Sequence, residues 1–160
     1  MSKNIKFFTL LFILFFFLTF EAAYAGKPPE FWIKNLEGER FRSSEQKSPF
    51  VISFFYVNCL PCIKEIPQLH KFMSTNYPDV PVLFMDPLKG DSKKDIINFS
   101  KKLNVPLSYF YKDSFGTISK KFFSKGKMYF PTIVGIEGEE YIFRYSKIDK
   151  KILSQIKSLL

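Results

Sequence analysis

Continuous apolar runs alternate along this chain with segments that carry apolar side chains at helical spacing. The runs at 50–56 and 80–85 are rich in β-branched and aromatic residues, which predicts strands covered on both faces. The segment after the first run predicts a helix with Ile63, Ile66, Leu69 and Met73 on one face. The later elements expected are a helix opened by Ser92 and Asp95, an extended piece at 107–111, a helix with Phe115, Ile118 and Phe122 on one face, strands at 133–136 and 141–145, and a helix capped by Asp149.

A shorter pattern precedes the first long strand. Residues 31–33 and Phe41 flank the sequence Leu-Glu-Gly-Glu at 36–39, which predicts an edge hairpin with a glycine turn. Strands that alternate with helices, followed by a final hairpin and helix, predict a central mixed β-sheet with helices on both faces. The expected fold class is therefore α/β with an N-terminal β-hairpin extension.

The first 25 residues have the pattern of a secretory signal peptide. Lys3 and Lys6 precede an uncharged run at 7–20 that is apolar except for Thr9 and Thr19, and small residues stand at Ala23 and Ala25. A helix over this run spans about 21 Å, short of the roughly 30 Å hydrocarbon core, so cleavage after Ala25 is favoured over an uncleaved anchor. We expect a signal peptide at 1–25 and one domain at 26–160. That domain would lie in the periplasm or on the outer face of the cytoplasmic membrane, and membrane association through residues 7–20 is the alternative.

Length and charge narrow the classes of partner. Residues 26–160 are enough to bury a single core without disulfide staples. Loss of the leader removes two lysines and one glutamate from the chain's net charge of +9, which leaves +8. An anionic lipid surface or an acidic partner would suit this charge. The lysines are scattered singly or in pairs, which favours a solvated surface and disfavours nucleic acid as a partner.

The two cysteines, Cys59 and Cys62, are separated by Leu60 and Pro61 where the first long strand meets the following helix. A disulfide in so short a loop stabilises the folded state by only about 2 kcal/mol, against about 4.7 kcal/mol for a hundred-residue loop. The pair is therefore better explained as a redox centre than as a stabilising cross-link. The unpaired N–H groups of a helix N-terminus stabilise a thiolate, and proline suits the first helical turn. The expected roles are an exposed nucleophile for Cys59 and a buried resolving thiol for Cys62.

Glu65 lies three residues after Cys62 and therefore on the same helix face. If its side chain is buried, its raised pKa would let it relay a proton to Cys62. If it is exposed, Glu65 is one more solvated charge. The sequence leaves the two alternatives open.

Pro131 follows Phe130 and precedes Thr132 at the start of an expected strand. A cis bond before Pro131 would present the Phe130 backbone to an extended partner for strand-like pairing beside the cysteines. A trans proline at a strand start is the commoner case for a proline taken alone.

The order of these features resembles the TlpA/ResA-like extracytoplasmic thioredoxins. The resemblance rests on Cys59-Leu60-Pro61-Cys62, on Glu65-Ile66-Pro67 and on Phe130-Pro131-Thr132, and it extends from about Lys27 to Leu160. It implies a thioredoxin-like fold, a reactive Cys59, a resolving Cys62, a cis-proline at Pro131 and an acidic tuning position at Glu65. It also implies client binding at Leu60, Pro61, Phe130, Pro131 and Thr132.

The chain departs from that family at three positions. Asn58 stands where tryptophan usually precedes the first cysteine, and Leu60 stands where glycine or glutamate is usual. Ser53 replaces the buried aspartate of thioredoxin or the asparagine common in this family. Glu65 is therefore expected to be the only acid near the cysteines.

The activity implied by the resemblance is thiol:disulfide oxidoreduction with no cofactor besides the Cys59–Cys62 disulfide. The favoured direction is reduction of exported clients, for example apocytochrome c or a copper-site protein, with electrons from a membrane donor of the DsbD/CcdA type. A disulfide oxidase or isomerase is the first alternative. A copper-binding assembly protein of the SCO type is the second, but such proteins use C-x-x-x-C with a distant histidine. The single histidine here, His70, is eight residues past Cys62 and is expected at the surface, so no metal site is expected. A peroxidase is disfavoured because no threonine-proline setting surrounds the reactive cysteine.

Overall fold

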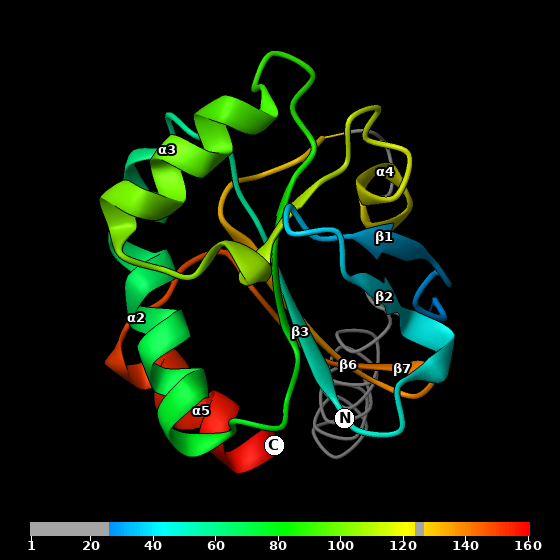
Figure 1. Cartoon of the computed structure of the whole chain (residues 1–160). Coiled ribbons are helices and arrows are strands. Elements are labelled where there is room, and N and C mark those ends of the chain that lie inside the picture. Colours follow the sequence, from blue (N-terminus) through cyan, green and yellow to red (C-terminus); the bar gives the residue numbers. More distant parts are fainter. Residues whose placement is uncertain (1–25, 124–126) are drawn as a thin grey trace, which may run out of the picture.

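The computed structural model describes residues 26–123 and 127–160 (Figure 1). The signal peptide expected at 1–25, with its apolar run at 7–20, lies outside the described residues. Within the described ranges, no helix is both long and apolar enough to cross a membrane.

The core of the molecule is a five-stranded mixed sheet, as the alternation of strands and helices predicted. Its strand order is β5-β4-β3-β6-β7. The first three of these run parallel, whereas β6 and β7 are antiparallel to their neighbours. The strands are β3 (Phe50–Phe54), β4 (Val82–Asp86), β5 (Phe110–Lys112), β6 (Thr132–Glu137) and β7 (Glu140–Tyr145).

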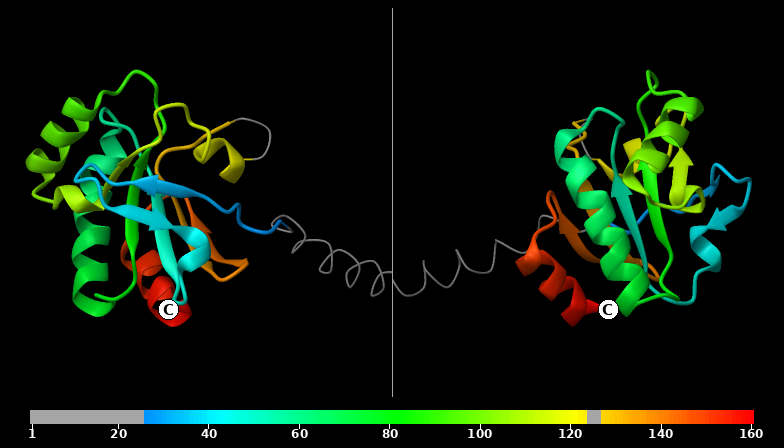
Figure 2. Two further views of the ribbon diagram at one scale, coloured as in Figure 1. Left: turned by 45° about the vertical axis from the view of Figure 1, so that its right-hand side comes forward. Right: turned by 60° about the vertical axis from the view of Figure 1, so that its left-hand side comes forward.

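The two faces of the sheet are covered differently (Figure 2). One face packs against α2 (Leu60–Asn76), α3 (Lys93–Leu103) and α5 (Lys150–Leu159). The other packs against α4 (Ser119–Phe122) and against the expected hairpin, which is formed by β1 (Trp32–Lys34) and β2 (Arg40–Arg42). Because all residues of β3 and β4 are buried, the continuous apolar runs are explained by coverage on both faces.

The hairpin also reaches the outer edge of the sheet. The backbone N–H of Leu36, in the turn between β1 and β2, donates to the carbonyl of Phe110 in β5 at 2.9 Å. An isolated bridge joins Asn35 to Tyr111 beside this bond. The hairpin therefore extends from one face of the sheet around its β5 edge.

Helix starts follow the local signals in the sequence. Ser92 and Asp95 form a reciprocal capping box at the start of α3, and the Asp149 side chain accepts from Ile152 N at the start of α5. The helix α2 continues past Pro67 to Asn76, so this proline does not end the helix.

Two expectations for the second half of the chain need correction. Residues 107–111 are only partly extended, because a 3₁₀ turn (Leu107–Tyr109) precedes β5. The apolar stripe at 115–122 is not one helix, since α4 begins only at Ser119 and Phe115 is 77% exposed. Gly116 has a φ of +62°, which is incompatible with a right-handed helix. The buried carboxylate of Asp113 accepts backbone N–H bonds from the residues after it and closes a loop there.

Candidate active site

Cys59 and Cys62 are joined by a disulfide at the N-terminus of α2. Cys59 is the N-cap residue, and its Sγ accepts a hydrogen bond from the backbone N–H of Cys62 at 3.2 Å. Pro61 stands in the first turn, where its missing N–H leaves no helical hydrogen bond unmade. In the reduced protein, this N–H and the helix dipole would favour a thiolate on Cys59 over one on Cys62.

The exposure predicted for Cys59 is wrong for this disulfide-bonded state. Cys59 is 1% exposed and Cys62 is fully buried, and both belong to the apolar cluster on the α2 face of the sheet. The N-cap geometry turns the Cys59 side chain inward. The exposed residues next to the cysteines are instead Asn58, Leu60 and Pro61, of which Leu60 is 76% exposed.

The predicted proline segment at 130–132 is brought to the cysteine turn by the pairing of two strands. Thr132 at the start of β6 pairs with Phe54 at the end of β3, which brings residues 130–132 beside the chain that leads to Cys59. The Phe130–Pro131 peptide bond is cis, as predicted. The rings of Phe130 and Tyr56 meet edge to face with centroids 5.3 Å apart, so the proline loop packs directly on the turn before Cys59.

Glu65 is neither fully buried nor fully solvated, which are the two alternatives that the sequence left open. Its side chain is half-buried on α2, and its Oε2 accepts a hydrogen bond from the backbone N–H of Ile148 at 2.7 Å. Burial raises the pKa of Glu65, although the bond from Ile148 offsets part of this effect. The carboxylate therefore ties α2 to the segment before α5, and it titrates at a higher pH than a solvated glutamate.

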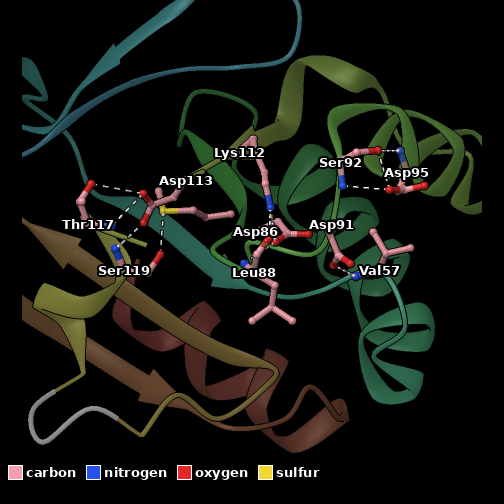
Figure 3. A network of polar contacts seen from close by, with 11 residues as sticks. Val57, Asp86, Leu88, Asp91, Ser92, Asp95, Lys112, Asp113, Thr117 and Ser119 are labelled. Carbon is pink, nitrogen blue, oxygen red and sulfur yellow. Dashed lines mark hydrogen bonds and ion pairs between the residues drawn. The ribbon is translucent and has the colours of Figure 1, made fainter. Parts of the chain in front are cut away.

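Sequence reasoning missed an acidic group on the other side of the cysteine turn (Figure 3). Asp91, in the loop between β4 and α3, accepts a hydrogen bond from the backbone N–H of Val57 at 2.9 Å. Val57 lies in the turn in which Cys59 N donates to Tyr56 O at 3.1 Å. The expectation that Glu65 is the only nearby acid is therefore wrong.

Asp86, the last residue of β4, is completely buried, and Asp91 is one of the groups that raise its pKa. Burial raises the pKa of Asp86 to about 7 despite its ion pair with Lys112. An aspartate at the carboxyl end of an otherwise apolar parallel strand was the signal available in the sequence, since loops at these ends commonly carry functional groups. Ser53 of β3 is buried as well.

His70 is partly exposed, and its ring packs edge to face on Tyr109 with centroids 4.7 Å apart, so it lies at the surface with one side covered. Burial lowers the pKa of its imidazole. Within residues 26–123 and 127–160, no group of three or more His, Cys, Asp or Glu side chains could hold a metal ion.

Comparisons with solved structures give the fold a name. No protein-family model and no curated protein matches the chain. StoA from Bacillus subtilis superposes with a TM-score of 0.67 at 20% identity, over 82% of this chain and 96% of StoA. A secreted Mycobacterium tuberculosis disulfide oxidoreductase homologous to Escherichia coli DsbE has a TM-score of 0.67 at 20% identity, over 81% of this chain and 96% of its own. The chain has a thioredoxin-like fold. The exposed lipoprotein thioredoxin Etrx1 of Streptococcus pneumoniae is similar as well, with a TM-score of 0.63 at 19% identity over 82% of this chain and 98% of Etrx1. In this thioredoxin-like domain, the disulfide lies at the start of α2 and the cis peptide bond precedes β6.

Proposed function

We propose that this protein is an exported thiol:disulfide oxidoreductase that reduces disulfides in exported client proteins. The observation that carries the proposal is the Cys59–Cys62 disulfide at a helix N-terminus, packed against the cis-proline loop through Tyr56 and Phe130. The predicted leader at 1–25 and the secreted or surface-exposed neighbours of the same fold support an extracytoplasmic location. The catalytic domain is then residues 26–160.

The reduced protein carries out two exchange steps. The Cys59 thiolate attacks one sulfur of the client disulfide, which forms a mixed disulfide and releases the first client thiolate. The Cys62 thiolate then attacks Cys59 Sγ, which restores the Cys59–Cys62 disulfide and releases the second client thiolate. Two electrons pass from the protein to the client, and two protons end on the client thiols. We assign to Glu65 the transfer of the Cys62 proton, since its raised pKa lies closer to that of a thiol than a solvated carboxylate does.

Client binding is assigned to the exposed surface next to the disulfide. Leu60 is 76% exposed and Pro61 is exposed beside it, which offers an apolar contact next to the reactive sulfur. The Phe130 backbone before Pro131 would pair with an extended client segment, as in strand addition. The Thr132 hydroxyl donates to the Tyr129 carbonyl at 2.7 Å, so it holds this loop in place for the client.

We assign the direction of electron flow as from this protein to the client. Proline at the second position between the cysteines resembles the reducing members of the fold. A reductant in an oxidising compartment needs electrons from across the membrane, and a donor of the DsbD/CcdA type would supply them. Disulfide oxidation or isomerisation is the alternative direction for the same site.

The deciding experiment is the reduction potential of the Cys59–Cys62 couple in the purified protein, equilibrated with glutathione or dithiothreitol buffers. We expect a value near or below about −230 mV, as in reducing thioredoxins. A value of about −120 to −180 mV would identify an oxidase or isomerase and overturn the direction proposed here. Failure to exchange with either buffer would overturn the activity itself.

A further inference from the structure

A buried ion pair lies beneath the loop that follows β4 (Figure 3). Oδ1 of Asp86 accepts hydrogen bonds from Leu88 N at 2.7 Å and from Lys112 Nζ at 3.1 Å. The same Lys112 ammonium donates to the Leu88 carbonyl. The side chain of Lys112 is 6% exposed and that of Asp86 is 0% exposed, so both charges are removed from water.

The second oxygen of Asp86 is in a different situation. Among the described residues, no N–H or O–H group donates to Oδ2. The carboxyl group of Asp91 is near enough to act on Asp86, and the interaction between the two groups raises the pKa of Asp86. Two ionised carboxylates are both acceptors, so a hydrogen bond forms between them only when one of them carries a proton.

Few other charges face this pair. Lys112 of β5 is the cation that contacts it, and the neighbouring strand β3 has the sequence Phe-Val-Ile-Ser-Phe, which has no charged side chain. On α3, exposed Asp95 interacts with Lys112 only through space. With one proton on the two carboxyl groups, Lys112 balances the remaining negative charge. Without that proton, one negative charge is left uncompensated at a buried position.

Asp91 links the protonation of this carboxyl pair to the turn before the cysteines. Its Oδ2 holds the backbone N–H of Val57, two residues before Cys59, in the turn closed by the Cys59 N to Tyr56 O bond. Lys112 therefore contacts Asp86, Asp91 contacts the turn that carries the nucleophile, and the two carboxyl groups between them act on each other electrostatically.

We propose that Asp91 is a positioning residue for Cys59, and that a proton shared with Asp86 controls how Asp91 holds the cysteine turn. This inference rests on the proposed function. With the proton present, Asp86 donates to Asp91 and keeps its carboxylate on Val57. When the proton leaves, the two carboxylates repel each other, and the added negative charge beside the turn disfavours the Cys59 thiolate. The pKa of Asp86, raised to about 7, places this change within the working range of the protein.

Two isosteric substitutions separate the parts of the mechanism. Asp91→Asn keeps an oxygen for Val57 N and gains an amide that donates to Asp86, while it removes the charge. We expect about a threefold larger thiolate fraction on Cys59 near pH 7, because one nearby negative charge is lost. Asp86→Asn gives Asp91 a permanent donor, so the step near pH 7 in the pH profile of the reduction potential should disappear. Both quantities are measured on the full chain, by thiolate ultraviolet absorbance and by glutathione equilibria across the pH range.

Asp95→Asn is the matched control. It removes the same charge from an exposed residue four positions after Asp91, which caps α3 and acts on Lys112 only through space. If Asp91→Asn and Asp86→Asn change the thiolate fraction and the pH profile no more than Asp95→Asn does, the inference is overturned. Wild-type protein that still exchanges disulfides in that case leaves the proposed function intact. If wild-type protein exchanges no disulfides, the proposed function is contradicted. The thiolate titration would still test the interaction of the two carboxyl groups with Cys59.

If Asp91→Asn or Asp86→Asn fails to fold, the proposal can still be tested on the wild-type protein. The infrared C=O band of a protonated carboxyl group reports the shared proton directly in the wild-type protein. We expect this band below pH 7 and its loss above, in step with the change in Cys59 thiolate absorbance. Absence of the band at mildly acidic pH, or its loss without any change at Cys59, contradicts the proposal.

Discussion

The backbone N–H of Cys62 points at Sγ of Cys59, 3.2 Å away, within the first turn of α2. A thiolate on Cys59 would keep this donor and the positive end of the helix, whereas Cys62 lies further along the first turn. The two cysteines are thus chemically unequal although they are joined in one disulfide.

This inequality predicts the order of their reactions. In the reduced protein, iodoacetamide should modify Cys59 first, as peptide mass mapping would show. Cys62→Ser should accumulate a mixed disulfide with a client, and Cys59→Ser should form none. Preferential labelling of Cys62 would reverse the assigned roles.

Two substitutions of Glu65 should have different effects on stability and on catalysis. Glu65→Ala leaves the Ile148 N–H without its acceptor and should lower the free energy of unfolding by about 1 kcal/mol in urea titrations. Glu65→Gln keeps an acceptor oxygen but cannot move a proton, so it should slow the Cys62 step about tenfold or more in single-turnover assays while its stability stays near that of wild type. An unchanged rate in Glu65→Gln would restrict Glu65 to tying α2 to the segment before α5.

Asp86 predicts how stability depends on pH. Its pKa is raised from 3.8 to about 7 on folding, so the folded state binds the proton more tightly than the unfolded chain does. The contribution is favourable at acidic pH and is lost as the pH rises from about 4 to about 7, by at most about 4 kcal/mol. Urea unfolding of wild type and Asp86→Asn across this range should give curves that diverge, since the variant lacks the decline. Parallel curves would contradict the raised pKa.

A substitution at Asp113, away from the cysteines, should change the stability of the protein and leave its reduction potential unchanged. The Asp113 carboxylate accepts from the backbone N–H groups of Thr117, Ile118 and Ser119 at 2.8–3.1 Å. Asp113→Ala would leave these donors without their acceptor, and we expect a loss of about 3 kcal/mol in unfolding free energy. The reduction potential of the variant, measured below its unfolding transition, should match that of wild type. A shifted potential would mean that this loop also acts on the active site.

The sequence predicted the elements whose causes are local. Runs of buried residues mark β3 and β4, and side-chain caps at Ser92 and Asp149 mark where α3 and α5 begin. The stripe at 115–122 was misleading because a glycine at positive φ and the Asp113 carboxylate decide that segment. A pattern of apolar residues does not contain this information.

The site was predictable only where it depends on spacing along one helix or one loop. Cys59, Cys62 and Pro131 occupy positions that such motifs specify. The burial of Cys59 depends on packing by the whole α2 face, and the contacts of Asp86 with Asp91 and Lys112 depend on the register between β4 and β5. Both are properties of the assembled sheet and have no signature within a short stretch of sequence.

The bond from Leu36 to Phe110 has a further consequence for behaviour in concentrated solution. An outer strand with unsatisfied backbone groups is a template on which another chain can add, and this is a common route to aggregation. The β1–β2 turn occupies part of that template on β5. At the opposite margin, β7 carries the charged residues Glu140 and Arg144, which discourage a second copy from pairing there. The fold thereby limits self-association at both margins of its sheet, while strand-like pairing with a client is left to the segment before Pro131.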